Sequence, residues 1–164
     1  SGSLMPGAPA RSLEGTEYQI KAAMMINFIQ FVEWPDDPDK SEELLVLGII
    51  GADNFGDTLN HIQGRIVNGK LLTLRRFNST QDLNQCQVVF VPESESYRIN
   101  EILTSLTGAP VLTIGETDKF TQLGGIIGFY IDETHVRFEI NKTAAMQSKL
   151  KISAKLMEIA RVVD

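Results

Sequence analysis

Hydrophobic residues along this chain recur with two alternating periods, one typical of helices and one typical of strands. Within Glu17–Val32, the helical period places four large apolar residues on one stripe: Ile20, Met24, Phe28 and Phe31. The helix is expected to end at Trp34-Pro35, because proline disfavours helical geometry in the residue before it. The pattern therefore predicts an amphipathic first helix over about Glu17–Val32.

Short apolar runs follow, each too brief for a typical helix. They predict four strands: Glu43–Ile50, Leu71–Phe77, Gln87–Val91 and Pro110–Gly115. A helical pattern over Glu95–Leu106 separates the last two of them, and another over Lys142–Arg161 follows later in the chain. Strands that alternate with helices favour a mostly parallel sheet with right-handed crossovers.

A β-hairpin is predicted near the C-terminal end. The stretches GGIIGFYI and THVRFEI flank Asp132-Glu133, a pair suited to a turn. We expect this hairpin to form an antiparallel edge of the sheet. The predicted fold class is therefore α/β, a mostly parallel twisted sheet flanked by helices with an antiparallel C-terminal hairpin at one edge.

The chain has 164 residues, of which 43% are hydrophobic, enough for one core. We expect a single domain over residues 17–163. Residues 1–16 are rich in glycine and proline, lack periodicity and are predicted to be a flexible leader. They contain no hydrophobic signal-peptide core, so any secretion signal is expected to have been removed.

Charge narrows the classes of partner. Fifteen Lys and Arg residues stand against 21 Asp and Glu, a net charge of −6, and no basic run is present to neutralise several phosphates. Nucleic acid is therefore not an expected partner. No apolar run approaches the roughly 20 residues that cross a bilayer.

Motifs for catalysis or metal binding are absent from the sequence. The two histidines, His61 and His135, show no spacing suited to a metal, and neither HExxH, CxxC nor GxSxG occurs. The loop GADNFG lacks the GK[ST] ending of a phosphate-binding loop. The lone Cys86 has no cation nearby in sequence and is predicted to be a buried, unreactive thiol. We expect no enzyme activity, no metal and no cofactor, although a serine paired with either histidine stays a minor alternative.

The junction RFEINKTAAMQ marks a change from strand to helix. Alternation puts Val136, Phe138 and Ile140 on one face of the strand, and the polar residues His135, Arg137 and Glu139 on the other. Asn141 follows and is predicted to cap the last helix, because its amide oxygen suits the unpaired N–H groups of a helix start. That helix is expected to bury one stripe: Met146, Leu150, Ser153, Met157 and Ala160.

Two groups of polar residues are candidates for binding. Asn27 interrupts an apolar helix, so its amide needs either a structural hydrogen bond or a partner. Ligands of open α/β sheets bind at the carboxyl ends of the parallel strands. The loops expected there supply Asn54, Phe55, Glu93 and Glu116 as candidate ligand-binding residues.

Three stretches together resemble the YfiR family of periplasmic bacterial proteins, over about Glu17–Val163. They are IKAAMMINFIQFVEWP, CQVVFV, and GGIIGFYI with VRFEINKTAAMQSKLKISAKLMEIARVV. The family pattern falls on Asn27 and on a structural signature: Phe28, Phe31, Trp34, Pro35, Gly124, Gly125, Phe138, Ile140, Asn141, Ser153 and Leu156. Many relatives read Cys-His where this chain has Cys86-Gln87, and it lacks the further cysteines of some relatives. Redox control through disulfides is not expected here.

The resemblance implies a non-catalytic periplasmic regulator. Such a protein binds and represses the periplasmic part of a membrane-anchored diguanylate cyclase, and thereby lowers cyclic-di-GMP and biofilm formation. The resemblance also implies a homodimer. Candidate partner-binding residues are Asn27, Phe55, His135, Arg137 and Glu139. The alternative is a periplasmic small-molecule binding or sensor module that uses the crevice at the strand ends.

Overall fold

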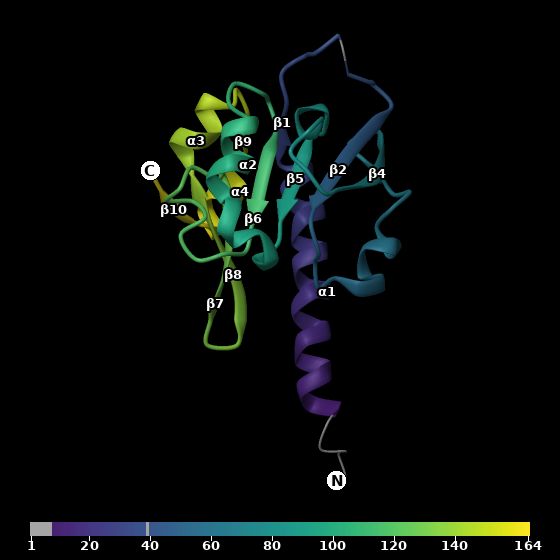
Figure 1. The fold of residues 1–164 in the computed structure, drawn as a ribbon, viewed down its shortest axis with the longest axis vertical. Helices are drawn as coiled ribbons and strands as arrows, with labels where there is room; N and C mark the ends of the chain where they lie inside the picture. The colour runs from purple at the N-terminus through teal and green to yellow at the C-terminus, as the bar shows by residue number, and fades with distance from the viewer. Residues whose placement is uncertain (1–7, 39) are drawn as a thin grey trace.

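A curled sheet of eight strands forms the centre of the molecule (Figure 1). The computed structural model describes residues 8–38 and 40–164, so residues 1–7 of the predicted leader lie outside the described residues. From one edge to the other the strands are β10 (Arg161–Val163), β8 (His135–Asn141), β7 (Ile127–Asp132), β6 (Leu112–Gly115), β5 (Val88–Val91), β2 (Leu44–Ile50), β4 (Lys70–Phe77) and β3 (Ile66–Val67).

The centre of the sheet is parallel, as predicted. β2 pairs in parallel with β4 and β5, β5 with β6, and β6 with β7. Every residue of β5 and β6 is buried. These strands are continuous apolar runs because helices or loops cover both of their faces, the usual situation of parallel strands.

The predicted antiparallel hairpin is also present. β7 and β8 pair from Ile127 with Ile140 to Asp132 with His135, and Glu133 in the turn has a left-handed φ of 58°. Its predicted place at the edge is taken by β10, which pairs in parallel with β8. The hairpin therefore lies one strand in from the edge.

The first helix, α1 (Ala8–Gln30), is longer than predicted. It begins at Ala8 instead of Glu17, so residues 8–16 of the predicted flexible leader are helical; Ala, Arg, Leu and Glu within them favour a helix. The buried stripe is also offset from the predicted one, because Ile20 is 38% exposed. The residues that α1 buries against the sheet are Tyr18, Ala22, Met25, Ile26, Phe28 and Ile29.

The opposite face of the sheet is covered by α2 (Ile99–Ser105), which buries Ile99 and Ile102 beside β5 and β6. The predicted helix over Glu95–Leu106 is thus divided, since its first part belongs to the 3₁₀ helix η3 (Glu93–Arg98). Two further 3₁₀ helices, η1 (Gly56–His61) and η2 (Leu83–Gln85), lie in the connections.

The predicted single helix over Lys142–Arg161 was wrong. α3 (Lys142–Gln147) ends where Lys149 adopts a left-handed φ of 61°, and β9 (Lys151–Ile152) then pairs with β1 (Val32–Glu33). α4 (Ala154–Ile159) starts anew, with Ser153 as its N-cap. Met146 is 72% exposed, so the predicted apolar stripe does not form. Strand pairing with β1 outweighs helix propensity here.

Several residues of the predicted signature hold these elements together. Asn141 caps α3 as predicted: its Oδ1 accepts from the Ala144 N–H at 3.0 Å. Its Nδ2 also donates to the Thr121 carbonyl at 2.8 Å. The Phe28 ring packs on Phe138 and Phe129, with centroids 4.7 and 5.6 Å away.

Two elements project beyond the sheet on the same side of the molecule. Figure 1 shows the N-terminal half of α1 and the β7–β8 hairpin extending past the ends of the parallel strands. This arrangement leaves the loops that follow β5 and β6 between α1 and the hairpin, whereas the segment after β2 continues to η1 on the other side of α1 (Figure 1).

Candidate functional site

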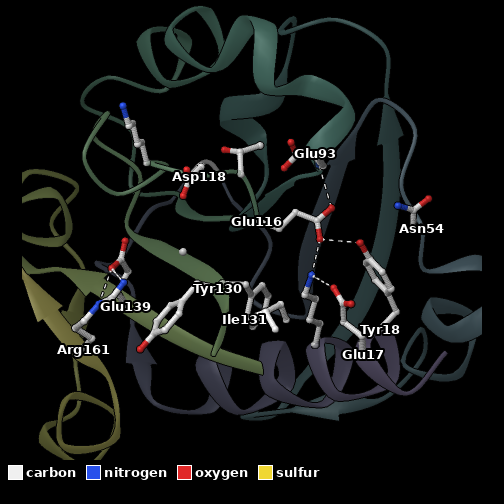
Figure 2. Close-up of a pocket in the computed structure, with 15 residues that line it drawn as sticks. Glu17, Tyr18, Asn54, Glu93, Glu116, Asp118, Tyr130, Ile131, Glu139 and Arg161 are labelled. Carbon is white, nitrogen blue, oxygen red and sulfur yellow. Dashed lines mark hydrogen bonds and ion pairs between the residues drawn. The ribbon is translucent and has the colours of Figure 1, made fainter. Parts of the chain in front are cut away.

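A pocket of about 420 Å³ lies at the carboxyl ends of β2, β5, β6 and β7 (Figure 2). Three of the four predicted ligand-binding residues line it, namely Asn54, Glu93 and Glu116. This is the place where open α/β sheets bind their ligands. The structure therefore brings these three residues together, while their role as ligand contacts stays a prediction.

Phe55, the fourth of these residues, does not belong to this surface. It is only 3% exposed, and its ring lies edge-on to Tyr18 and Phe90 with both centroids 5.0 Å away. The prediction of an exposed, partner-binding aromatic at this position was wrong. This large apolar ring, in the loop after β2, packs under α1 instead of facing water.

Glu116 is the centre of a hydrogen-bond network on one wall of the pocket. Its Oε1 accepts from the Tyr18 hydroxyl at 2.9 Å and from Lys21 Nζ at 2.7 Å. Its Oε2 accepts from the backbone N–H of Glu93 at 3.0 Å. Figure 2 shows Tyr18 and Glu17 approaching from α1 and Glu116 from the opposite loop. The network ties the first helix to the strand ends.

Lys21 was missed from the sequence. Its side chain is 4% exposed and is paired with Glu116 and, one helical turn away, with Glu17 at 2.7 Å. Burial lowers the pKa of Lys21, but its hydrogen bonds to Glu116 and Glu17 outweigh burial, and the net direction is upward. A lysine within the apolar run QIKAAM was the signal for a buried, paired cation.

A second cluster forms the opposite wall. Glu139 accepts two hydrogen bonds from Arg161, at 3.0 and 2.7 Å, and one from the Thr121 hydroxyl. The Arg161 guanidinium also lies over the Tyr130 ring, 4.0 Å from its centroid. Arg161 was expected at the end of a helix, so only the structure reveals its position on β10 beside Glu139.

A second, more apolar groove of about 460 Å³ separates α1 from the hairpin. Ile20 of α1 and Ile131 and Val136 of the hairpin line it, together with the more polar Thr16, Asn54 and Thr134. Ile131 is 49% exposed. Ile20, 38% exposed, lines the same groove, and adjoining exposed apolar side chains, unlike single ones, can mark a protein-binding surface.

Comparison with known proteins identifies the family. The family model described as YfiR/HmsC-like matches residues 18–161. The chain belongs to the YfiR/HmsC-like family. Members of this family are periplasmic regulatory proteins connected with diguanylate cyclases, which agrees with the resemblance in the first helix and at the strand-to-helix junction.

Two solved structures share the fold of this YfiR/HmsC-like chain. A conserved domain protein from Vibrio cholerae O1 biovar El Tor matches with a TM-score of 0.57 and 12% identity over 90% of this chain. The ABC domain from Streptococcus pneumoniae, in complex with L-Trp, matches with a TM-score of 0.58 and 11% identity over 87%. This chain spans 60% of the length of each. At such identities the likeness concerns the fold alone.

The remaining predicted partner residues of this YfiR/HmsC-like protein lie on two elements. His135 and Arg137 are exposed on β8, where Arg137 donates to Asp132 at 3.0 Å, and Glu139 is half-buried in the pocket. Asn27 is exposed on α1, which packs on the other face of this strand through Phe28 and Phe138. The structure therefore does not bring Asn27 into one surface with His135 and Arg137.

Three features considered in the sequence can be checked in the structure: the Cys86 thiol, a metal site and a membrane-spanning helix. Cys86 is fully buried, as predicted, and burial raises the pKa of its thiol to about 11; its low reactivity stays a prediction. Among residues 8–38 and 40–164, no group of three or more His, Cys, Asp or Glu side chains is placed to hold a metal ion. Within the same ranges, no helix is long and apolar enough to cross a membrane.

Proposed function

We propose that this YfiR/HmsC-like protein binds the periplasmic part of a membrane-anchored diguanylate cyclase and represses it, which lowers cyclic-di-GMP and biofilm formation. The observation that carries the proposal is the family match over residues 18–161. A regulator of this kind acts by binding, so its function depends on an exposed surface of the chain.

We place the partner on the projecting end of the molecule. This hairpin surface covers both faces of the hairpin: Ile131 and Thr134 lie beside Ile20 of α1, and His135 and Arg137 lie on the opposite face, all of them exposed. Ile131 supplies an apolar contact next to the groove, and Arg137 supplies a guanidinium on the outer face of the hairpin. Binding energy in protein interfaces concentrates in such apolar and arginine anchors.

A homodimer is part of the proposal, since the family resemblance implies one. Light scattering on the purified chain measures its mass directly. A mass of about twice 18.2 kDa supports the dimer, and a monomer at all concentrations contradicts that part of the account.

The test is a binding measurement between the purified chain and the purified periplasmic part of a cyclase encoded by a neighbouring gene. Ile131→Asp or Arg137→Ala is expected to weaken the complex about tenfold or more. Ile66→Asp is the matched control, because Ile66 is equally apolar and 66% exposed on β3, at the far edge of the sheet. If Ile131→Asp and Ile66→Asp lowered the affinity for the cyclase equally, the hairpin surface would not be the binding site.

A further inference from the structure

The pocket at the strand ends borders a free edge of the sheet. β6 ends at Gly115, opposite Gly128, whereas β7 continues to Asp132. Asn141 donates its backbone N–H to the Ile126 carbonyl, so residues 128 and 130, which follow at steps of two, direct their main-chain groups to β8. Phe129 and Ile131 direct theirs to the other side of β7. The Phe129 N–H donates to the Gly115 carbonyl in the pairing with β6, whereas the Phe129 carbonyl and the main chain of Ile131 face the pocket, where none of the described strands lies beside them. These are hydrogen-bonding groups available to a ligand.

The charged lining of this pocket favours a cation. It contains five carboxylates and three basic side chains, a net charge of −2: Glu17, Glu93, Glu116, Asp118 and Glu139 against Lys21, Lys119 and Arg161. Glu116 and Glu139 already neutralise Lys21 and Arg161. Within the described part of the chain, Glu93 and Asp118 make no ion pair and are exposed. Among the described residues Lys119 makes no ion pair either, so the unpaired charges of the lining are two carboxylates and one lysine, a surplus of one negative charge.

Thr117 supplies an independent sign of a missing partner. It lies between Glu116 and Asp118, lines the same pocket and is 5% exposed. Its hydroxyl is the buried side-chain polar atom that finds no hydrogen-bond partner among the described residues. A buried hydroxyl without a partner costs free energy, so such groups are uncommon unless a ligand or water completes them.

We propose that this pocket binds a small organic molecule carrying a protonated amine. The ammonium group lies between the carboxylates of Glu93 and Asp118, and a neighbouring polar group of the ligand bonds to the Thr117 hydroxyl, to the Phe129 carbonyl or to the main chain of Ile131. A volume of about 420 Å³ fits a small molecule. The net negative lining disfavours phosphates and other anions. Since Glu116 also holds Lys21, the ligand would sit directly against the contact that fixes α1.

The test uses calorimetry on the full chain with two amines, tyramine and 1,4-diaminobutane, and their neutral counterparts, tyrosol and 1,4-butanediol. We expect saturable binding of at least one amine, and binding of its neutral counterpart at least about tenfold weaker. No binding of either amine up to about 10 mM would overturn the proposal. Equal binding of the neutral counterparts, or binding of Ca²⁺ in place of the amines, would overturn it as well.

Variants locate the site. The double substitution Glu93→Gln/Asp118→Asn is expected to weaken amine binding about three- to tenfold, the effect of losing two solvent-exposed charge contacts. Glu101→Gln/Glu158→Gln removes the same charge from exposed positions outside the pocket and should leave binding unchanged. Thr117→Val should weaken binding without lowering the melting temperature of the free protein, because it removes only an unpaired hydroxyl. Unchanged binding in the first variant would contradict the assigned site.

Discussion

Lys21 and Glu116 form a buried ion pair with 2.7 Å between Nζ and Oε1, although 95 residues separate them in the chain. Each side chain is 4% exposed. The pair joins α1 to the loop after β6, and Tyr18 and the Glu93 N–H complete the bonds of Glu116. Such a pair fixes geometry, because removing one partner leaves the other charge buried and uncompensated.

Lys21→Met is therefore expected to lower the free energy of unfolding by about 3 kcal/mol. The double variant Lys21→Met/Glu116→Leu should recover part of this loss, since it leaves no unpaired buried charge. Urea denaturation of the two variants and the parent measures both effects. An unchanged midpoint for Lys21→Met would show that the pair is not coupled to folding.

The raised pKa of the Cys86 thiol predicts how the free energy of unfolding changes at alkaline pH. Burial raises the pKa of its thiol from the ordinary 9.0 to about 11, so the folded state keeps a proton that the unfolded state loses. The resulting stabilisation is fully present below pH 9 and is lost as the pH rises towards 11. The raised pKa of Lys21 acts in the same direction, but above pH 10.5.

Denaturation curves between pH 9 and 10 separate the contribution of Cys86 to the free energy of unfolding from that of Lys21. Cys86→Ala should show a flatter decline of unfolding free energy over this interval than the parent protein. Parallel declines in the two proteins would mean that the thiol does not titrate differently on folding.

Asn141→Ala should cost about 2 kcal/mol of stability, more than the loss of a helix cap alone. The amide also donates to the buried Thr121 carbonyl, which the substitution leaves without that donor. Asn141→Ser keeps a cap oxygen without a charge and removes the amide donor, so thermal or urea denaturation should place it between the parent and the Ala variant. A cost equal for both variants would assign the whole effect to the Thr121 bond.

Gly125 is expected to resist substitution. A Cβ at this position would overlap the Phe120 ring, which is 1% exposed and also fills the space beside Gly115. Gly125→Ala should destabilise the fold by about 1 to 3 kcal/mol, as overpacked cores do. Phe120→Leu made in the Gly125→Ala background should cost less than Phe120→Leu alone, because it relieves the overlap.

The central sheet was predictable because its strands are short apolar runs between turn residues, and the alternation in VRFEI fixed both faces of β8. Asn141 was predictable as a cap because capping is a local interaction. The division of the last helix was not, because it depends on Lys151 and Ile152 pairing with Val32 and Glu33. Two short strands that pair across more than 100 residues of sequence produce no local hydrophobic pattern that would predict them.

The candidate site shows the same division. Asn54, Glu93 and Glu116 were placed correctly at the pocket, because loops after parallel strands converge at one edge of a sheet. Lys21 and Arg161 were missed, since each reaches the pocket from an element distant in the sequence. Phe55 was misplaced because its loop position suggested exposure, whereas its ring completes the core beneath α1.

The most direct test of the central claim is the cyclic-di-GMP level of cells that express a neighbouring-gene diguanylate cyclase with or without this chain, supplied with a secretion signal. The account predicts a lower level when the chain is present, and recovery of the level with Ile131→Asp but not with Ile66→Asp. An unchanged level, together with no complex between the purified periplasmic parts, would contradict the account.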